Sequence, residues 1–363
     1  MKCKNIIPTD IGIRERIIVI GDLHGDIDAL KKCLEMSKLV NKNGNWIGGN
    51  TVLIQIGDQM DSSRGEMLSN DKSRFSFFEI DKILSKLGRQ AEKTCLKNKN
   101  GKKTCGKVVS LLGNHEIMNL KGDFRYVGSK QYEETSDYLN SDNEDHMENR
   151  NILFKKNKKF RKSIACNRTL VLKSGKWIFV HGGLVLKLIK NYSLERINEI
   201  ARQWILGIDI QDIELNEVLF EKYSPTWYRG YGKSNVNCKE LNKVLNILKA
   251  NNMVIGHTVQ EKNINSKCNG KIWRIDTGLS LRTNIDTIDS IEVLEILNNT
   301  DINIYKYRDY LFSLNIISFL KKFDSINIYN LQIIHSKNNP DIILKNNKII
   351  IINKKYDFLK IYF

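Results

Sequence analysis

The sequence has no uninterrupted apolar run near the ~20 residues that a membrane-spanning helix needs. Its first residues, Met1 to Asn5, are not followed by the apolar stretch of a secretory signal. None of its seven cysteines forms a Cys-x-x-Cys pair with another. These absences argue against a membrane or secreted protein. They predict a cytoplasmic protein with reduced thiols and no membrane partner.

Acidic residues are also few relative to basic ones, 41 against 58, which gives a formal net charge of +17. Two acid-free basic runs, residues 93–107 and 150–162, contribute to this excess, and an acidic run over residues 133–148 precedes the second. Two interpretations stay open, namely solvated loops that pair electrostatically or a docking surface for anionic substrates. Because only Phe154 and Phe160 interleave the basic runs, nucleic acid is not the expected partner.

The length and composition predict one large core with an appendage, since 41% of the 363 residues are hydrophobic. We expect residues 1–300 to form the main domain, with residues 90–107 as an inserted basic loop, most simply an exposed hairpin. Residues 301–363 are rich in Ile, Asn, Lys and Tyr and carry no motif. Alternating stretches such as 341–352 suit a small β appendage in this C-terminal extension.

Five short runs rich in β-branched residues read as buried strands, and each leads into a motif of Gly with Asp, Asn or His. The motifs are Gly21–Gly25, Gly57–Asp61, Gly113–Glu116, His181–Gly183 and Gly256–Thr258. Residues 26–40, 71–87, 193–206 and 239–250 fit amphipathic helices, and residues 271–275 and 290–296 fit further strands. In open α/β sheets, ligands bind beyond the carboxyl ends of strands, so the motifs should converge on one rim.

The motif residues offer the ligands of two divalent metal ions. Asp22 and His24 alternate on a strand-to-loop turn and can face one ion, and Asp58 has two oxygens with which to bridge two. Asn114, His181 and His257 would complete the second ion's set. The mixed His, Asp and Asn donors suit Mn, Fe or Zn and do not choose among them. Two such ions ~3.5–4 Å apart acidify a bridging water and clamp phosphate oxygens.

His115 and Asp61 remain for proton transfer. His115 adjoins the candidate ligand Asn114 and would point toward a bound phosphate, while Asp61 could hold the imidazole charged. This makes His115 the candidate general acid for the leaving group. His146, in the acidic run, and His335, in the extension, are not expected to be catalytic.

Longer strings resemble the calcineurin-like metallophosphoesterases, in particular the phosphoprotein phosphatase branch and its Shewanella-like phosphatases. The strings span residues 111–119, 122–126, 224–230, 256–260 and 268–278, within a similarity that covers roughly residues 15–298. The resemblance implies an αββα sandwich with a dinuclear metal site at the C-terminal rim of the strands. It implies Asp22, His24 and Asp58 on one metal, with Asp58, Asn114, His181 and His257 on the other. It also implies His115 with Asp61 as the acid pair.

The chain departs from the family pattern at one place. The family usually has Arg-Gly directly after the residue that matches Asp61, whereas here Ser62 and Ser63 intervene before Arg64. Arg229 is therefore the stronger candidate for the phosphate clamp, because a guanidinium fork matches phosphate oxygens. Arg64 and Asn114 are further candidates for phosphate contact. For Arg125, a structural role and a substrate role are equally open.

The leading hypothesis is a metal-dependent phosphoprotein phosphatase that acts on serine, threonine or tyrosine phosphate with a metal-bridging hydroxide as nucleophile. A dinucleoside polyphosphate hydrolase of the same fold is the first alternative. A non-catalytic phosphopeptide-binding module is the second, and the presence of every expected ligand and of the acid pair weighs against it. The oligomeric state and the native metals are not predicted.

Overall fold

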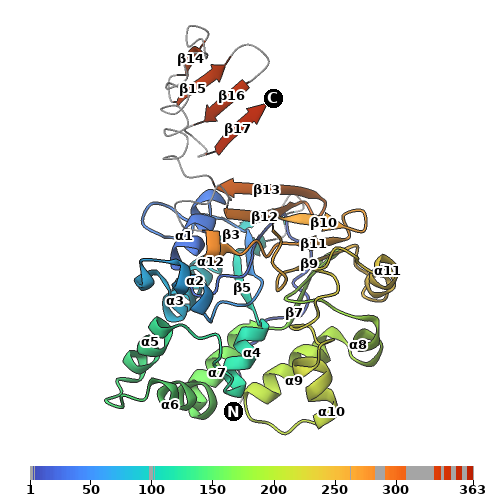
Figure 1. Cartoon of the computed structure of the whole chain (residues 1–363). Helices are drawn as coiled ribbons and strands as arrows, with labels where there is room; N and C mark the ends of the chain where they lie inside the picture. The colour runs from blue at the N-terminus through green and yellow to red at the C-terminus, as the bar shows by residue number, and fades with distance from the viewer. Residues whose placement is uncertain are drawn as a thin grey trace.

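Two β-sheets packed face to face form the centre of the computed structural model (Figure 1). It describes residues 3, 5–97, 101, 103–261, 263–282 and 291–307, and four strands farther along the chain. The six-stranded sheet has the order β13-β12-β1-β2-β5-β6, and the five-stranded sheet the order β10-β11-β9-β8-β7. Their bounds are β1 Arg16–Ile20, β2 Val52–Gln55, β5 Lys107–Leu111, β6 Arg168–Thr169, β7 Val171–Ser174, β8 Trp177–Val180, β9 Asn252–Ile255, β10 Asn265–Lys267, β11 Ile272–Arg274, β12 Ile291–Leu297 and β13 Asp301–Tyr307.

Side-chain alternation along β1 explains the layers. Ile18 and Ile20 pack against the helices outside the six-stranded sheet, whereas Ile17 and Val19 pack against the second sheet. Successive strand residues point to opposite faces, so an all-apolar strand must be covered on both. The outer face of the second sheet is buried beneath another set of helices. The predicted αββα sandwich is confirmed.

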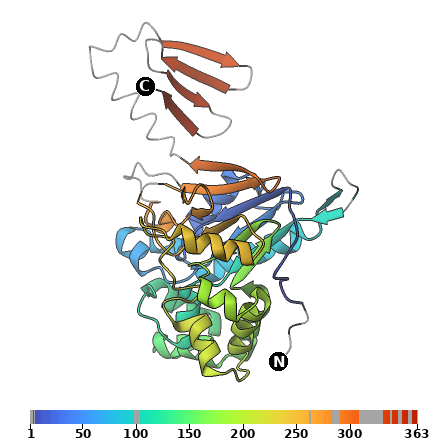
Figure 2. The ribbon, with the colours of Figure 1, turned by 90° about the vertical axis from the view of Figure 1, so that its right-hand side faces the viewer.

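Helices cover the two outer faces of the sandwich (Figures 1 and 2). The four predicted helices form as α1, α3, α9 and α11, and several more connect the strands. Their bounds are α1 Ile27–Met36, α2 Ser63–Leu68, η1 Lys72–Arg74, α3 Phe77–Ala91, α4 Asn114–Lys121, α5 Ser129–Leu139, α6 His146–Asn151, η2 Ile152–Lys156, α7 Lys158–Asn167, α8 Leu186–Asn191, α9 Leu194–Ile205, α10 Asp212–Leu215, η3 Asn216–Phe220, α11 Cys238–Ile247 and α12 Leu279–Arg282.

Strand direction brings the motifs to one rim. Within the first sheet β1, β2, β5 and β6 are parallel, and within the second β8, β9 and β11 are parallel. The five motifs follow β1, β2, β5, β8 and β9 at their carboxyl ends. Both sheets therefore contribute to a single cluster of loops.

The main domain extends beyond residue 300, where the sequence placed its C-terminal boundary. Strand β13 lies beyond residue 300, yet it pairs along its whole length with β12 and becomes the edge of the first sheet. Its alternating side chains Ile302 and Ile304 pack against the core between the sheets, which explains why it belongs there. Farther on, β14 Leu331–Ser336 pairs with β15 Asn339–Leu344, and β16 Ile349–Asn353 pairs with β17 Phe358–Tyr362. The predicted stretch 341–352 falls on β15 and β16.

The cysteine prediction is wrong for six of the seven residues, because the structure contains three disulfides. Cys3 pairs with Cys166, Cys95 with Cys105 and Cys238 with Cys268, with Cα–Cα separations of 5.5, 3.8 and 5.4 Å. The pairs lie 163, 10 and 30 residues apart in sequence, so only the fold brings them together. The cysteines therefore no longer support a reducing compartment.

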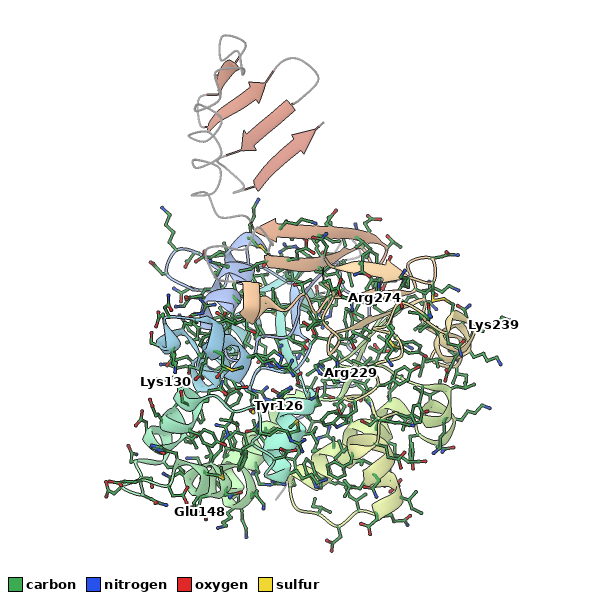
Figure 3. All side chains as sticks on the ribbon, viewed as in Figure 1. Tyr126, Lys130, Glu148, Arg229, Lys239 and Arg274 are labelled. Carbon is green, nitrogen blue, oxygen red and sulfur yellow. A yellow bond between two sulfur atoms is a disulfide. The ribbon has the colours of Figure 1, made fainter. Side chains whose placement is uncertain are left out.

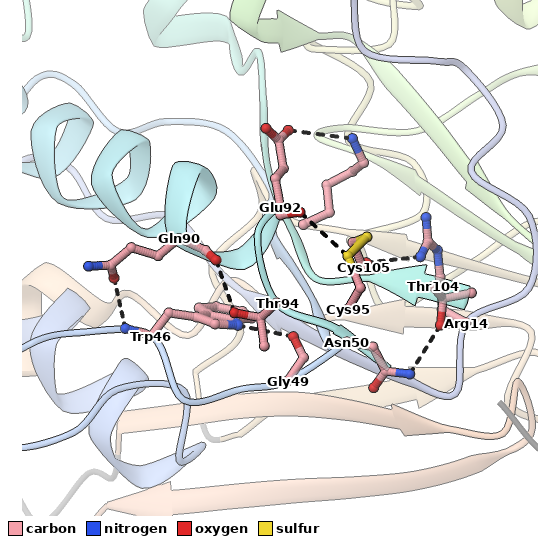
Figure 4. Close-up of a disulfide and its surroundings, with 11 residues drawn as sticks. Arg14, Trp46, Gly49, Asn50, Gln90, Glu92, Thr94, Cys95, Thr104 and Cys105 are labelled. Atoms are coloured by element: carbon pink, nitrogen blue, oxygen red, sulfur yellow. Dashed lines mark hydrogen bonds and ion pairs between the residues drawn. A yellow bond between two sulfur atoms is a disulfide. The ribbon is translucent and has the colours of Figure 1, made fainter. Parts of the chain in front are cut away.

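The inserted basic loop is a hairpin, as expected. Strands β3 Cys95–Lys97 and β4 Lys103–Cys105 pair antiparallel, with Cys95 opposite Cys105, and the hairpin projects from the body of the molecule (Figure 2). At its base Arg14 donates a hydrogen bond of 3.2 Å to the Cys105 carbonyl, and Asn50 donates one of 3.2 Å to Thr104 Oγ1 (Figure 4). These contacts join the hairpin to the first sheet's neighbouring loops.

The second basic run is helical rather than a loop, since it forms η2 and α7. Lys156 pairs with Glu148 of the acidic run at 2.8 Å, which fits the electrostatic pairing of the two runs. Arg150 is the exception, because its side chain is buried. Among the described residues, no helix combines the length and apolar character required to cross a membrane.

Candidate active site

The loop after β2 brings the candidate bridging carboxylate next to the candidate acid. Asp58 Oδ1 accepts a hydrogen bond of 3.0 Å from the backbone amide of His115, and the imidazole Nε2 of His115 lies 3.8 Å from Asp58 Oδ2. On the other side of the ring, Nδ1 of His115 is bonded to Asp61 Oδ2 at 2.7 Å. One nitrogen of His115 is thus anchored, and the other faces the cluster of candidate ligands.

Backbone strain is concentrated at these positions. His24, Asp58, Asp61 and His257 have φ angles of 46°, 53°, 68° and 65°, in the left-handed region that non-glycine residues seldom adopt. Each such conformation costs on the order of 1–3 kcal/mol and persists only where surrounding contacts impose it. Four strained residues in one cluster of loops are typical of a functional site.

Three histidines each use one ring nitrogen for a backbone carbonyl. Nδ1 of His24 donates to the Met60 carbonyl at 3.1 Å, and Nδ1 of His181 donates to the Ile56 carbonyl at 3.1 Å. Nε2 of His257 donates in the same way to a carbonyl in the loop before α11, at 3.2 Å. Metal-binding histidines are usually oriented by such a bond, which fixes the tautomer and directs the other nitrogen to the ion.

The donor atoms form two overlapping groups around Asp58. One contains His24, Asp58 and His115, the other Asp58, His181 and His257, and within each group the possible ligand atoms lie within 4.8 Å of one another. Asn114 Oδ1 lies 3.0 Å from Nε2 of His181, beside the second group. The first group contains His115 in the place where the sequence suggested Asp22, so its third ligand stays a prediction.

Asp22 nevertheless lies at the same centre. Its Oδ2 accepts a hydrogen bond of 3.0 Å from the backbone amide of His257, while its buried Oδ1 has no hydrogen-bond partner. A Cβ atom at Gly256 would collide with this Oδ1, and one at Gly113 would collide with Asp58 Oδ1. The glycines leave room beside both carboxylates, and an orphaned buried oxygen fits a cation as its missing partner.

The pKa shifts of the site residues also favour a bound cation. Burial, with Asp276 and Asp58 nearby, raises the pKa of Asp22 well above its usual range. Burial and the neighbouring His115 lower the pKa of His24 to about 4, which keeps this imidazole neutral, as a metal ligand must be. Burial would lower the pKa of His115 as well, but Asp58 and Asp61 outweigh it and raise that pKa to about 9. His115 is therefore the protonated member of the group.

Sequence reasoning missed the residues that support this centre. Both oxygens of the buried Glu116 accept backbone amides, from Asp58 at 2.9 Å, Gln59 at 2.8 Å and Gly113 at 2.7 Å. Glu116 stands at the third position of α4, where an acidic residue commonly caps a helix, so the motif held a signal for it. Gln131, which accepts a bond of 2.9 Å from the Asp61 amide, had no local signal.

The candidate phosphate-binding arginines approach the site from two directions. Exposed Arg64 lies over the Tyr126 ring, with 5.3 Å from its guanidinium carbon to the ring centroid, and Tyr126 lies 5.3 Å from the ring of His115. Arg229 donates a hydrogen bond of 2.6 Å to the His257 carbonyl. Figure 3 shows Tyr126 and Arg229 near the centre of the view. Arg125 instead pairs with Asp123 at 2.7 Å on the surface, which favours its structural role.

A cleft of about 580 Å³ adjoins Arg229. Aromatic side chains of Phe220, Tyr223 and Trp227 line it together with the cations of Lys222, Lys233 and Arg229. The Trp227 carbonyl is the one that orients His257, so one wall of the cleft also contacts a candidate ligand. Its composition suits an anionic ligand with apolar parts.

A model of the calcineurin-like phosphoesterase domain matches residues 15–261, which include the five motifs that follow the strands. The chain belongs to the calcineurin-like phosphoesterase family. It is therefore a phosphoesterase enzyme, and the resemblance drawn from the sequence is confirmed. Shewanella-like protein phosphatase 2 of Arabidopsis thaliana is 29% identical over 338 residues, which are 80% of this chain and 77% of the relative. Shewanella-like protein phosphatase 1 of Plasmodium berghei is 33% identical over 280 residues, 74% of this chain and 68% of the relative.

Solved structures support the fold of this phosphoesterase. The cold-active protein-tyrosine phosphatase of a psychrophilic Shewanella species superposes with a TM-score of 0.60 at 23% identity, over 83% of each chain. A protein serine/threonine phosphatase from Saccharomyces cerevisiae gives a TM-score of 0.50 at 13% identity, over 84% of this chain and 85% of that one. At these identities the likeness shows the shared αββα architecture.

Proposed function

We propose that this phosphoesterase is a metal-dependent phosphoprotein phosphatase that hydrolyses serine, threonine or tyrosine phosphate. The observation that carries the proposal is the pairing of His115 with Asp61 beside a carboxylate, Asp58, that two groups of candidate ligands share. The names of the two Shewanella-like relatives agree with it. The proposal includes manganese as the activating ion, because the His, Asp and Asn donors suit it.

Two divalent ions would be held by Asp22, His24 and Asp58 on one side and by Asp58, Asn114, His181 and His257 on the other. When bound, such ions lower the pKa of a water molecule and neutralise phosphoryl oxygens. The orphaned Asp22 oxygen supports this ligand set, as does the anchoring of each of the three histidines by one ring nitrogen to a backbone carbonyl, which leaves the other nitrogen for the ion.

Each side chain would then have a separate role in the reaction. Water would add to phosphorus and release a proton to the solvent, the phosphorus–oxygen bond to the substrate alcohol would break, and protonated His115 would give its proton to that leaving oxygen. Asp61 stabilises the positive imidazolium and fixes its direction. Arg229, with Arg64 and Asn114, would hold the remaining phosphoryl oxygens, since a guanidinium can bind two of them at once.

The cleft beside Arg229 supports a peptide rather than a small substrate. Its aromatic floor can cover the side chains that flank a phosphorylated residue, while Lys222 and Lys233 attract acidic ones. A dinucleoside polyphosphate is also anionic, so the assay has to include one.

The test is a turnover assay on metal-stripped protein to which Mn²⁺ is returned. Phosphoserine, phosphothreonine and phosphotyrosine peptides are offered beside a dinucleoside polyphosphate. We expect release of phosphate from at least one peptide, restored by the metal. Cleavage of the dinucleotide alone would contradict the protein phosphatase assignment, and metal binding without any turnover would point to a binding module.

A further inference from the structure

A line of hydrogen bonds leads from the candidate acid into the protein interior. Asp61 uses one oxygen for His115, and its Oδ1 accepts a bond of 2.8 Å from Nδ2 of Asn119. Oδ1 of Asn119 in turn accepts a bond of 2.8 Å from Nε of Arg150. All four side chains are buried. The line therefore ends on an arginine that has no access to substrate or solvent.

Arg150 is held in place from several sides. It lies on α6, 31 residues beyond Asn119, and its Nη1 donates to Thr135 Oγ1 at 2.8 Å and to the Gln131 carbonyl at 3.2 Å, both on α5. Its guanidinium carbon lies 4.6 Å from the centroid of the Phe154 ring. Its buried Nη2 has no hydrogen-bond partner and is 3.9 Å from Asp61 Oδ1.

Burying the charged side chain of Arg150 lowers the free energy of unfolding. An arginine only 1% exposed has lost its hydration, and an apolar side chain of similar size often serves a core equally well or better. The guanidinium group of Arg150 nevertheless connects through the Asn119 amide to Asp61, the partner of His115. Its geometry points to a role in the reaction, in addition to packing.

We propose that Arg150 is a positioning residue: it holds the amide of Asn119 in place and thereby fixes the Asp61 carboxylate against Nδ1 of His115. The inference rests on the function proposed above.

The chemistry of the amide explains the effect. An asparagine side chain has one donor end and one acceptor end. Because Nε of Arg150 donates to Oδ1 of Asn119, the NH₂ group is the end that faces Asp61. The same NH₂ group also donates to the His115 carbonyl at 2.9 Å, so the amide keeps its orientation when Arg150 is lost. Its oxygen end, however, then has no donor to hold it in place. The Asp61 carboxylate is held less firmly as a result, and His115 loses the direction from which Nε2 protonates the leaving oxygen.

A defect transmitted through His115 depends on the leaving group. The alkoxide of serine departs poorly unless it receives a proton, whereas p-nitrophenolate departs without one. Loss of Arg150 should therefore impair hydrolysis of a phosphoserine peptide much more than hydrolysis of p-nitrophenyl phosphate. A general loosening of the fold would impair both substrates alike.

The experiment compares Arg150→Met with the wild-type protein on these two substrates, with the Mn²⁺-loaded enzyme in each case. We expect kcat for the phosphoserine peptide to fall by ~10²-fold, the scale of a misplaced catalytic group, with little change in KM. We expect kcat for p-nitrophenyl phosphate and the bound metal content to stay close to wild type. Arg150→Lys keeps the charge without the fork and should remain defective on the peptide.

Arg161→Met is the matched control. Arg161 lies on the adjacent α7 and donates hydrogen bonds to four backbone carbonyls, one of them that of Leu120 at the end of α4. It stabilises the same region but makes none of the contacts that lead to Asp61. Any loss of rate in this variant should be equal on the two substrates.

Equal loss on both substrates in Arg150→Met, unimpaired peptide turnover, or full activity in Arg150→Lys would each overturn the proposal. A wild-type protein that hydrolyses neither substrate would instead reject the proposed function. Should Arg150→Met fail to fold, Asn119→Leu interrupts the same line while Arg150 keeps Thr135 and Gln131, and the same selective loss is expected. Where both single variants fold, the double variant should be no slower on the peptide than Asn119→Leu alone.

Discussion

At the scale of single residues, the candidate site combines buried acidic side chains with strained backbone, and bound cations would relieve the repulsion between the acids. Asp22 and Asp58 are buried acids beside one another, and four of the site's residues adopt left-handed backbone. Glu116 holds the strained Asp58 loop by accepting three backbone amides within it and in the next motif. Supporting contacts of this kind maintain the strained backbone conformations. They also hold the candidate ligands in place before any metal binds.

Asp58→Asn should remove metal and activity together. The substitution keeps the size of the side chain but removes the negative charge that both ions are proposed to share. We expect bound metal, measured by elemental analysis after dialysis, to fall together with peptide turnover. Asp123→Asn, a surface carboxylate paired with Arg125, serves as the control and should change neither. Full activity in Asp58→Asn would overturn the bridging assignment.

His115→Asn separates proton transfer from metal binding. The imidazole is anchored to Asp61 and carries a pKa raised to about 9, as suits an acid, so its loss should slow turnover by the ~10²–10⁴-fold typical of a missing general acid. Metal content should be unchanged. If metal is lost instead, His115 is a ligand of the first group, in which it lies with His24 and Asp58.

At the scale of elements, the connection between the parallel strands β5 and β6 consists of several helices rather than a single one. It contains α4, α5, α6, η2 and α7, and it contributes His115, Gln131 and Arg150 to the surroundings of Asp61. Where α5 meets α3, the half-buried Glu134 accepts a hydrogen bond from the hydroxyl of Ser76, the N-cap residue of α3. The partial burial of this carboxyl group predicts that the stability of the junction depends on pH.

Glu134→Gln should remove a pH dependence of stability. Burial raises the folded-state pKa of Glu134 to about 7, against the hydrogen bond from Ser76, whereas an unfolded glutamate titrates near ~4.3. Between these values the folded protein holds a proton that the unfolded chain has released, so wild-type stability falls as pH rises through this window. The melting temperature of Glu134→Gln, relative to wild type, should therefore be higher at about pH 8 than at about pH 5. Glu133→Gln, an exposed neighbour, should show no such trend.

At the scale of the whole molecule, the disulfides differ in how much chain they close. Cys3–Cys166 spans 163 residues and Cys95–Cys105 spans 10. Cross-linking restricts the unfolded chain more when the closed loop is longer, and the chain-entropy model gives a difference of about 2.5 kcal/mol between these two. Replacing Cys3 and Cys166 by Ser should thus lower the free energy of unfolding in urea more than replacing Cys95 and Cys105. Equal losses would contradict the entropic account.

Much of this architecture could be predicted because its signals are local. The buried strands are continuous apolar runs, and each of the five runs that were predicted to precede a motif forms a strand. Helix α3 was predicted from residue 71, but it begins at Phe77, because the Ser76 hydroxyl accepts the Glu79 amide as N-cap and residues 72–74 form only a single 3₁₀ turn. Such an error of a few residues leaves the fold unchanged.

The parts that could not be predicted depend on partners far away in the sequence. Arg150 stood at the start of a run that looked solvated, and its burial follows from Asn119 and from the aromatic rings around it. The disulfides carried no spacing signal. The candidate ligand residues could be named from the sequence because each follows a strand, and their binding to metal stays a prediction.

The site draws on both sheets, and this has a consequence for how the chain is made. The backbone amide of His257 donates to Asp22, 235 residues earlier. A ribosome releases the polypeptide from its amino end, so Asp22 and His24 emerge long before His257, which follows β9. Until then only β7 and β8 of the second sheet are available to cover the apolar inner face of the first, and a nascent chain of this kind needs protection from aggregation. Truncated products that end before β9 should accumulate as insoluble protein, because they lack three strands of the second sheet and two of the first, together with one of the site's donors.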